Sequence, residues 1–459
     1  MAETVTPSTP PLLHSLDPLL REWLPRQRWF AGKGRPVTGF SMVAETELLP
    51  SDNRLGLHHL LVRAEQPPAP AEAGDCYQLL IGVREALPPR LAPALIGHLT
   101  DGPWAGHTVY DALYDPRPAE VLLEALRTQA HIGGLFFERE PGQEIRDGLV
   151  ARLLTAEQSN SSVVYGDTFI LKLLRRVVPG VNPDLEIPLA LAREGCDRVP
   201  APTAWLRAEL ADEPDASYVL AVLQPFIRGA TDGWELALRE LAKGEDFTAE
   251  ARALGRATAE VHTALALALP TVTLGHSQLE SMVAGMTERL ETAAQAVPAL
   301  RPYEGGLRSA YEALAGLSAE GRTWTAQRVH GDLHLGQCLR SPSGEWSLID
   351  FEGEPARPLA ERRMPQPPVR DIAGMLRSFD YAAHSMTPPA RDWAHRCRAA
   401  YCSGYAEIAG IDPRTDPVLL RAYETDKAVY EVVYEARHRP DWLPVPLSAV
   451  HRLATSDST

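Results

Sequence analysis

A polar loop and a short hairpin, set inside an otherwise helical half of the chain, constrain the fold more than any other feature. From Gly229 almost to the C-terminus, apolar residues recur at helical spacing, as in residues 254–265. The segment 329–353, VHGDLHLGQCLRSPSGEWSLIDFEG, interrupts this pattern. Within it, QCLR and EWSLID predict two strands, and SPSG contains the Pro and Gly that favour a turn. A helical domain must therefore accommodate a hairpin and the loop that enters it.

Three polar side chains stand at the ends of this hairpin. Asp332 precedes Gln337 by five residues in the entering loop, and Asp350 follows the second strand. Neighbouring strands lie about 5 Å apart, so we expect Gln337 and Asp350 to face each other. Their oxygen atoms suit a hard divalent cation. The sequence therefore predicts a metal site at Gln337 and Asp350, next to the loop that carries Asp332.

The stretch before the helical half predicts a small β-rich region. SSVVY and TFILKLLRR are expected to form a hairpin through the two-residue turn GD. A helix should follow, with Asn182 as its N-cap, Pro183 in its first turn and Gly195 after its end. TAWLRAE and SYVLAVLQPFI predict two further strands. Lys172 then lies in a strand of alternating apolar residues, and Glu186 lies near the start of the helix.

This order of elements meets the needs of phosphoryl transfer. The reaction needs a metal on the phosphates, a carboxylate that takes the acceptor's proton, and a cation on the phosphates. Asp332 and Gln337 have the spacing of a kinase catalytic loop, with Gln in place of Asn, and Asp350 takes the place of the Asp in D-F-G. Lys172 and Glu186 match the phosphate-binding lysine and its helix partner. The predicted fold class is α+β: a bilobal protein-kinase-like fold with a small β-rich N-lobe and a mainly helical C-lobe.

Each of these residues also has an ordinary structural explanation. A lone lysine in a strand is commonly a solvated edge residue, and a glutamate near a helix start commonly serves the helix dipole. Their order along the chain and their placement on the expected elements favour the catalytic interpretation. Gly331 stands where protein kinases have an arginine that reads a phosphorylated loop, which favours a small-molecule acceptor.

The chain has no glycine-rich G-x-G-x-x-G loop to cover the phosphates. The entry to the first hairpin, EQSNSSVVYG, offers hydroxyl, amide and backbone N–H groups instead. We predict phosphate contacts from this segment, against the alternative of an ordinary polar turn. The residues are Ser159, Asn160, Ser161 and Ser162.

Charge, N-terminal sequence and cysteine usage exclude several classes of protein. The formal net charge of −15 argues against binding to nucleic acid or to an anionic membrane surface. Residues 1–16 have no basic region followed by an apolar core, so no secretory signal is expected. The five cysteines form no C-x-x-C pair, which is typical of a reduced compartment. We expect a cytoplasmic protein with neither nucleic-acid nor membrane partners.

Longer motifs resemble those of the bacterial maltokinases, which are aminoglycoside-phosphotransferase-like relatives of the protein kinases with an N-terminal cap. The resemblance runs nearly end to end, and its most specific segments are RWFAGKGR (28–35) and YEARHRPDW (434–442). The other matching segments are EQSNSSVVYGD (157–167), NPDLEIPLAL (182–191), LQPFIRGATDGWELAL (223–238), HGDLHLGQ (330–337), IDFEGEP (349–355) and RDIAGMLRSFDYAA (370–383).

The resemblance implies a reaction and roles for the polar residues of the second hairpin. The reaction is ATP-dependent phosphorylation of maltose to maltose 1-phosphate, which feeds α-glucan synthesis. Asp332 becomes the catalytic base, and Gln337 and Asp350 become the Mg²⁺ ligands. The sequence leaves open whether a trehalose-converting enzyme is a partner.

The resemblance also implies an ATP site and a division into domains. Lys172 and Glu186 would orient the phosphates as a pair, and backbone groups around Gln224 and Phe226 would hold the adenine. The expected domains are a cap (1–140), an N-lobe (141–228) and a C-lobe (229–459).

The segment 427–442 is the predicted sugar site. Val429, Val432, Val433 and Ala436 form one apolar stripe of a helix, which should pack on the core. The other faces carry aromatic and charged groups that suit the CH faces and hydroxyls of a disaccharide. The alternative is a solvated helix with pairs such as Lys427–Glu431. The predicted sugar contacts are Tyr430, Glu431, Tyr434, Arg437 and His438.

The sequence leaves other functions open. A glucose or glucosamine kinase is the nearest alternative, but an amino sugar should want an unpaired carboxylate, and none can be assigned. An aminoglycoside or choline kinase would have an acidic, cation-binding site. A catalytically inactive scaffold would be expected to lack the lysine or one of the two aspartates, and all three are present.

Overall fold

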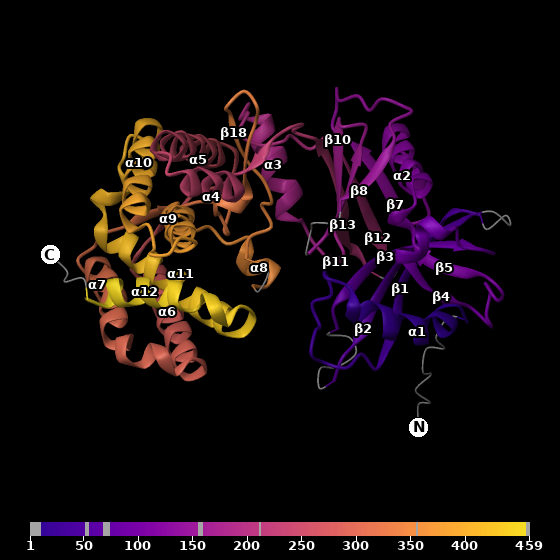
Figure 1. Ribbon diagram of the computed structural model, residues 1–459, viewed down its shortest axis with the longest axis horizontal. Coiled ribbons are helices and arrows are strands. Elements are labelled where there is room, and N and C mark those ends of the chain that lie inside the picture. Colours follow the sequence, from indigo (N-terminus) through magenta and orange to yellow (C-terminus); the bar gives the residue numbers. More distant parts are fainter. Residues whose placement is uncertain are drawn as a thin grey trace. The chain divides into compact units, whose positions relative to one another are not determined.

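The computed structural model of the chain describes residues 11–50, 55–67, 74–154, 159–210, 213–354 and 357–455 (Figure 1). The chain forms two compact units. One contains Met1–Leu185 and Ala201–Arg228, and the other contains Glu186–Pro200 and Gly229–Thr459. The finer division at residues 140 and 228 into cap, N-lobe and C-lobe stays a prediction. The N-terminal segment 1–10, on which most of the signal-sequence prediction rests, lies outside the described residues.

The first unit begins with an antiparallel sheet that carries helix α1 (Pro11–Trp23). Its central strands, β2 (Gly56–Glu65) and β3 (Cys76–Arg84), are buried along nearly their whole length, and they bury polar as well as apolar side chains. Helix α1 buries Leu13, Leu16 and Leu20 in the core of this sheet. In sheet order, the strands are β1 (Gly39–Leu49), β2 (Gly56–Glu65), β3 (Cys76–Arg84), β5 (Thr108–Asp111) and β4 (Leu95–His98), with β11 (Arg176–Val177) paired to β3.

The second sheet of this unit contains the predicted first hairpin. Strands β9 (Ser161–Tyr165) and β10 (Phe169–Leu173) pair antiparallel, which confirms that hairpin. Gly166 and Asp167 have positive φ angles of 54° and 51°, and the Thr168 N–H closes the turn on the Tyr165 carbonyl. In sheet order, the strands are β6 (His131–Ile132), β7 (Leu135–Arg139), β12 (Ala204–Leu210), β13 (Glu213–Pro225), β10, β9 and β8 (Ala151–Leu154), and the connecting helix is α2 (Pro116–Thr128).

A buried glutamine connects the two sheets. The Gln78 amide donates to the carbonyls of Leu174 (2.7 Å) and Leu220 (2.9 Å), and its oxygen accepts from Nε2 of His59 (2.9 Å). A second connection is Arg175, which donates to Ser161 (2.8 Å) and Asp111 (2.6 Å). Buried polar groups need such partners, so these contacts fix how the two sheets pack within the unit.

The second unit is mainly helical (Figure 1). Helix α3 (Pro183–Arg193) has the predicted cap, because the Asn182 side chain accepts from the Asp184 N–H at 2.8 Å. Gly195 follows its end with a φ of 75°. The remaining helices are α4 (Gly233–Lys243), α5 (Thr248–Ala268), α6 (His276–Ala296), α7 (Glu304–Ala319), α8 (Leu359–Arg362), α9 (Val369–His384), α10 (Arg391–Ala409), α11 (Pro417–His438) and α12 (Pro444–Thr455). The short strands are β14 (Thr231–Asp232), β15 (Val272–Leu274), β16 (Trp324–Ala326), β17 (Cys338–Arg340) and β18 (Trp346–Leu348).

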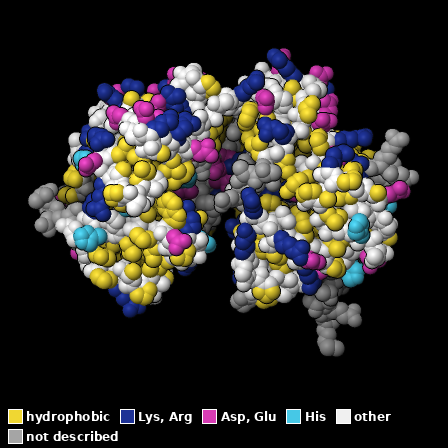
Figure 2. Space-filling model, in the orientation of Figure 1, with side chains coloured by type: hydrophobic (Ala, Val, Ile, Leu, Met, Phe, Trp, Pro, Cys, Tyr) yellow, Lys and Arg dark blue, Asp and Glu magenta, His cyan; other side chains and the backbone are white. Residues whose placement is uncertain are grey.

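Helices α5 and α10 pack closely against each other, with a glycine of each helix at the contact. A Cβ on Gly404 would lie 2.0 Å from the Arg252 carbonyl, and one on Gly255 would lie 2.1 Å from the Tyr401 carbonyl. The predicted apolar stripes are confirmed: Leu254, Val261 and Leu265 of α5 are buried, as are Val429 and Val432 of α11. Among the described residues, no helix is long and apolar enough to cross a membrane. Basic, acidic and apolar side chains are interspersed on the face in view (Figure 2).

We predict that His59 makes stability depend on pH. Burial disfavours the imidazolium and lowers the pKa of His59 from 6.5 to about 4, although the hydrogen bond with Gln78 opposes this shift. Between these values the unfolded chain binds one proton more than the folded chain, so stability falls as pH drops from about 6.5 to about 4. The loss at pH 5 should be on the order of 2 kcal/mol.

Denaturant unfolding at pH 7 and pH 5 measures this effect. His59→Gln should lose less stability than the wild type over this interval. His14→Gln is the matched control, because His14 is exposed on α1, and it should keep the wild-type pH dependence. An unchanged pH dependence in His59→Gln would exclude His59 as the responsible group.

Candidate active site

A buried carboxylate holds the loop that carries Asp332. Asp371, in α9, accepts from the backbone N–H groups of His330 (2.7 Å) and Gly331 (2.8 Å) and from Nε2 of His262 (3.0 Å). Burial alone would raise the pKa of Asp371, but the hydrogen bond and charge of His262 hold it below its ordinary value. Gly331 has a φ of 85°, which a residue with a side chain adopts only under strain. The loop therefore has one fixed path, and sequence reasoning missed the residue that fixes it.

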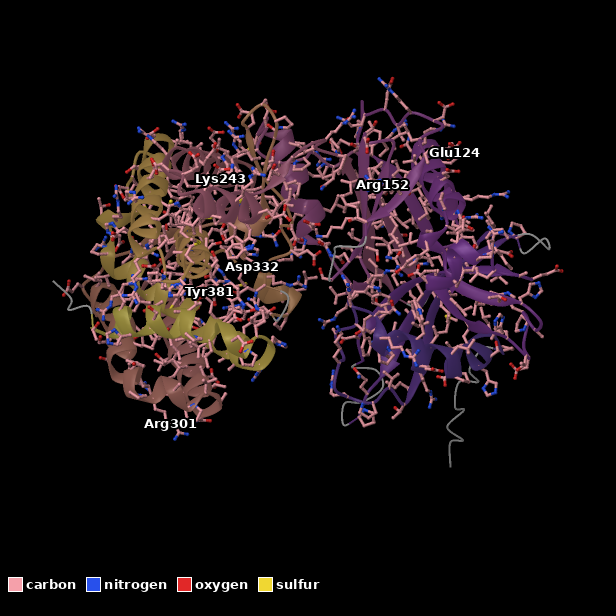
Figure 3. All side chains as sticks on the ribbon, viewed as in Figure 1. Glu124, Arg152, Lys243, Arg301, Asp332 and Tyr381 are labelled. Carbon is pink, nitrogen blue, oxygen red and sulfur yellow. The ribbon has the colours of Figure 1, made fainter. Side chains whose placement is uncertain are left out.

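Asp332 lies in the second unit (Figure 3). It is paired with a lysine of α11. Lys427 Nζ lies 2.9 Å from Asp332 Oδ1 and 3.2 Å from Glu354 Oε1. Burial alone would lower the pKa of Lys427, but Asp332 and Glu354 raise it above its ordinary value. Lys427 is therefore an ammonium group beside the predicted base. From the sequence, Lys427 is assigned only a pairing with Glu431 on a solvated helix.

Glu354 completes a cluster of charges beside Asp332. Its carboxylate accepts from Arg357 (2.6 Å), Arg370 (3.1 Å) and Lys427. Burial would raise the pKa of Glu354, but these three cations outweigh it and lower the pKa to about 2. The carboxylate is thus ionised and fully engaged at neutral pH. A pocket in this unit is lined by Asp332, Glu354, Lys427 and Tyr430 together with Gly331, Leu333, Arg357, Arg370, Gly374, Tyr423 and Asp426.

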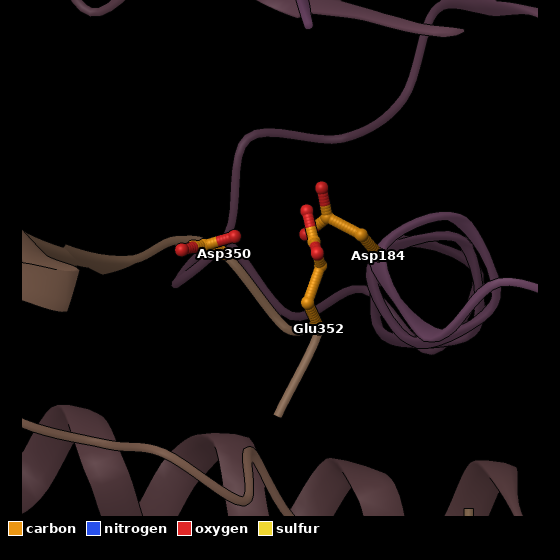
Figure 4. A group of neighbouring side chains, drawn as sticks. All are labelled: Asp184, Asp350 and Glu352. Carbon is orange, nitrogen blue, oxygen red and sulfur yellow. The ribbon is translucent and has the colours of Figure 1, made fainter. Parts of the chain in front are cut away.

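The second hairpin brings the two predicted metal ligands together. The Ile349 N–H donates to the Gln337 carbonyl (3.0 Å), and the Gln337 Nε2 donates to Asp350 Oδ2 (2.8 Å). Asp350 has a φ of 66°, a conformation that few residues other than glycine adopt and that is common at functional sites. Figure 4 shows Asp350 and Glu352 on the segment that leaves β18, and Asp184 at the start of α3. The carboxylate oxygens of Asp350 and the amide oxygen of Gln337 suit a hard cation. The role of these two residues as metal ligands stays a prediction.

Lys172 has a carboxylate partner that the sequence did not single out. Its Nζ lies 2.9 Å from Asp184 Oδ2. Glu186 accepts from Arg328 (2.6 Å) and Arg363 (3.1 Å). The pairing of Lys172 with Glu186 stays a prediction.

Two of the four residues of the predicted phosphate segment, Ser161 and Ser162, lie in strand β9. Ser161 accepts from Arg175 Nε, Ser162 and Asn160 are buried, and the Asn160 amide lies 3.4 Å from the Ser159 hydroxyl. The preceding residues 155–158 lie outside the described residues. Phosphate contacts from Ser159, Asn160, Ser161 and Ser162 stay a prediction.

One donor of the predicted adenine segment is already in use. The backbone N–H of Phe226 donates to the Thr168 carbonyl at 2.9 Å. Gln224 pairs with Ile170 in the β10–β13 ladder. An adenine held at this segment would therefore have to use groups other than the Phe226 N–H, and the assignment of Gln224 and Phe226 stays a prediction.

Comparison with known proteins identifies the family. The model of a family described as "Phosphotransferase enzyme family" matches residues 150–411, which is more than half of the chain. The chain belongs to this phosphotransferase family. A second model, described as the maltokinase N-terminal cap domain, matches residues 23–115. The cap and the phosphotransferase domain that the sequence motifs predicted are thus confirmed.

Relatives and solved structures agree with this assignment. A glucosamine kinase from Streptacidiphilus jiangxiensis is 30% identical over 322 residues, covering 64% of this chain and 71% of the relative. One from Mycolicibacterium smegmatis is 29% identical over 323 residues, covering 66% and 79%. A solved glucosamine kinase (crystal form B) has a TM-score of 0.69 at 24% identity, covering 96% of this chain and 99% of that one. The kinase-like fold is confirmed, and this phosphotransferase is related to sugar kinases.

The predicted sugar face of α11 is only partly at the Asp332 pocket. Tyr430 lines the pocket, and its ring centroid lies 5.0 Å from Lys427 Nζ. The Tyr434 ring lies 6.2 Å from that of Tyr430 and is 39% exposed, so it extends the aromatic surface outward. Arg437 and His438 are exposed near the end of the helix. Sugar contacts by these four residues stay a prediction.

Glu431 is a correction to the predicted sugar contacts. It is buried, and its Oε2 accepts from Nε (2.9 Å) and Nη2 (2.8 Å) of Arg377. Burial raises the pKa of Glu431, although the buried guanidinium of Arg377 opposes this shift. Helix α11 turns this residue toward α9, so its carboxylate serves the core and not a ligand.

We predict that Glu431→Gln is destabilising. The substitution leaves the buried Arg377 guanidinium without its charged partner on α11, which should lower the free energy of unfolding by about 3 kcal/mol. Tyr434→Ala, at an exposed position of the same helix, should change it by less than about 1 kcal/mol. Urea unfolding of the two variants measures the difference. Equal stability of Glu431→Gln and wild type would show that the ion pair contributes nothing.

Proposed function

We propose that this phosphotransferase moves the terminal phosphoryl group of ATP to the anomeric hydroxyl of maltose. The products are maltose 1-phosphate and ADP, and the reaction feeds α-glucan synthesis. The observation that carries the proposal is the set of side chains around Asp332, in which each carboxylate is paired with a cation and the Tyr430 ring lies beside Lys427. Such side chains suit a neutral sugar, whose hydroxyls need hydrogen bonds and whose CH faces need apolar surface. The maltokinase-type cap supports the same substrate.

In this mechanism Asp332 takes the proton of the acceptor hydroxyl. Its Oδ1 is held by Lys427, so in this proposal Oδ2 is the oxygen that receives the proton. Gln337 and Asp350 would hold Mg²⁺, which supplies charge neutralisation on the phosphates when bound. Lys172, oriented by Asp184, would contact the phosphates. The phosphoryl group passes to the hydroxyl oxygen as the bond to ADP breaks.

The cellular setting is proposed from the cysteines. All five are free thiols, four of them buried, which suits the reducing cytoplasm. Association with a trehalose-converting enzyme stays a prediction.

A second candidate is phosphorylation of glucosamine, which the names of the relatives favour. An ammonium substituent needs a carboxylate that has no other cation. Within the described part of the pocket, the carboxylates of Asp332, Glu354 and Asp426 are each already paired with a lysine or an arginine. Maltose is therefore the preferred acceptor. Release of ADP with Mg²⁺, ATP and a panel of sugars tests the choice, and activity restricted to glucosamine would reverse it.

We predict that Asp332→Asn lowers turnover by roughly two to four orders of magnitude, the usual contribution of a general base. The amide cannot accept the proton, but it keeps the shape of the side chain, and Lys427 keeps its pair with Glu354, so the variant should stay folded with a lowered melting temperature. Steady-state kinetics with ATP and maltose measure the loss. Turnover within threefold of wild type would remove Asp332 from the mechanism.

A further inference from the structure

The position of Lys427 has a consequence for the choice of acceptor. Its ammonium group bridges Asp332 and Glu354 at 2.9 and 3.2 Å and lies 5.0 Å from the centre of the Tyr430 ring. The side chain is only 19% exposed. A buried cation of this kind cannot swing into solvent without breaking its ion pairs with Asp332 and Glu354, which is unfavourable. Lys427 is therefore a fixed positive charge in the wall of the pocket.

The charges around Lys427 are balanced within the protein. Glu354 is shared by Lys427, Arg357 and Arg370. Asp426, on the same pocket, is held by Arg289 at 2.9 Å. Glu431, one turn along α11, belongs to Arg377. Tyr430 and His334 are further titratable side chains near Lys427 among the described residues. Among the described lining residues, every carboxylate thus has a cation.

We propose that Lys427 is a selectivity residue that excludes cationic acceptors from this site. The inference rests on the proposed phosphorylation of a neutral sugar. The inference explains why the site would reject an amino sugar whose amine is protonated. Lys427 would act on the acceptor's charge and not on its shape.

Geometry makes the expected discrimination large enough to measure. The reacting hydroxyl must come within hydrogen-bonding distance of Asp332, whose carboxylate also holds Lys427. Lys427 offsets the attraction that Asp332 and Glu354 would otherwise exert on a positively charged acceptor, so an ammonium substituent would lose its water and gain no unpaired carboxylate. With an effective dielectric constant of about 20, one uncompensated charge at about 5 Å changes binding by roughly a hundredfold.

A pair of sugars that differ in one group tests the proposal. Glucosamine and glucose are used as inhibitors of maltose phosphorylation, at pH 6.5 and at pH 9. The glucosamine amine, with a pKa of about 8 as for an α-amino group, is charged at the lower pH and largely neutral at the higher. Lys427 stays charged at both, because its pKa is raised. In the wild type, the inhibition constant of glucosamine should exceed that of glucose by at least tenfold at pH 6.5 and approach it at pH 9.

The variant Lys427→Met keeps the length of the side chain and removes its charge. In this variant, the inhibition constant of glucosamine divided by that of glucose at pH 6.5 should fall at least tenfold below the wild-type value. This ratio should also vary little with pH. Lys243→Met is the matched control, because it removes an exposed lysine of the same unit outside the pocket, and it should keep the wild-type ratios. A lysine that only positions Asp332 would change turnover and leave the ratios as they are.

The outcomes separate this inference from the proposed function. If maltose is phosphorylated and the wild-type ratio does not change between the two pH values, Lys427 is not a charge filter, even if Lys427→Met fails to fold. Retention of the wild-type ratios by a folded Lys427→Met variant would overturn the inference in the same way. Absence of maltose phosphorylation in the wild type, with turnover of glucosamine, would overturn the proposed function as well.

Discussion

The catalytic region depends on one buried carboxylate, that of Asp371. It accepts from two consecutive backbone N–H groups of the loop and from His262 of α5, so one side chain of α9 connects a second helix to the loop. Ionised carboxylates bind backbone donors more strongly than neutral acceptors do. Because the backbone on the N-terminal side of Asp332 is held in this way, the predicted base has a defined position before any substrate arrives. Such preorganisation is what general-base chemistry needs.

Helix α11 adds the second constraint, and it does so with charge. Lys427 pairs with Asp332 and Glu354 on one side, and Glu431 pairs with Arg377 on the other. Buried ion pairs add little net stability compared with apolar packing, but removal of one partner is strongly unfavourable. We infer that these pairs are kept because they fix where each charge lies. The result is a pocket with internally balanced charge beside the base, which is a suitable environment for a neutral polyol.

Local sequence patterns predicted the fold well. They could not predict which side chains that are distant in sequence pair with one another. The hairpins, the Asn182 cap and the apolar stripe of α11 follow from spacing and turn chemistry. Asp184 and Glu186 both lie near the start of one helix, and no local pattern singled out Asp184 as a partner of Lys172. Periodicity likewise separated three faces of α11 without showing which one meets α9, so Glu431 was placed at the sugar. Lys427 lies 95 residues after Asp332, and no local pattern relates the two.

The most direct test of this account is a competition between two acceptors, followed by phosphorus NMR. The protein receives Mg²⁺, ATP and equal concentrations of maltose and glucosamine at pH 6.5. We expect one new phosphate ester signal, split by the single anomeric proton of maltose 1-phosphate, and no phosphorylated glucosamine. A spectrum in which the ester belongs to glucosamine, or to a primary hydroxyl of maltose, would contradict both the acceptor and the position of the acceptor hydroxyl at Asp332.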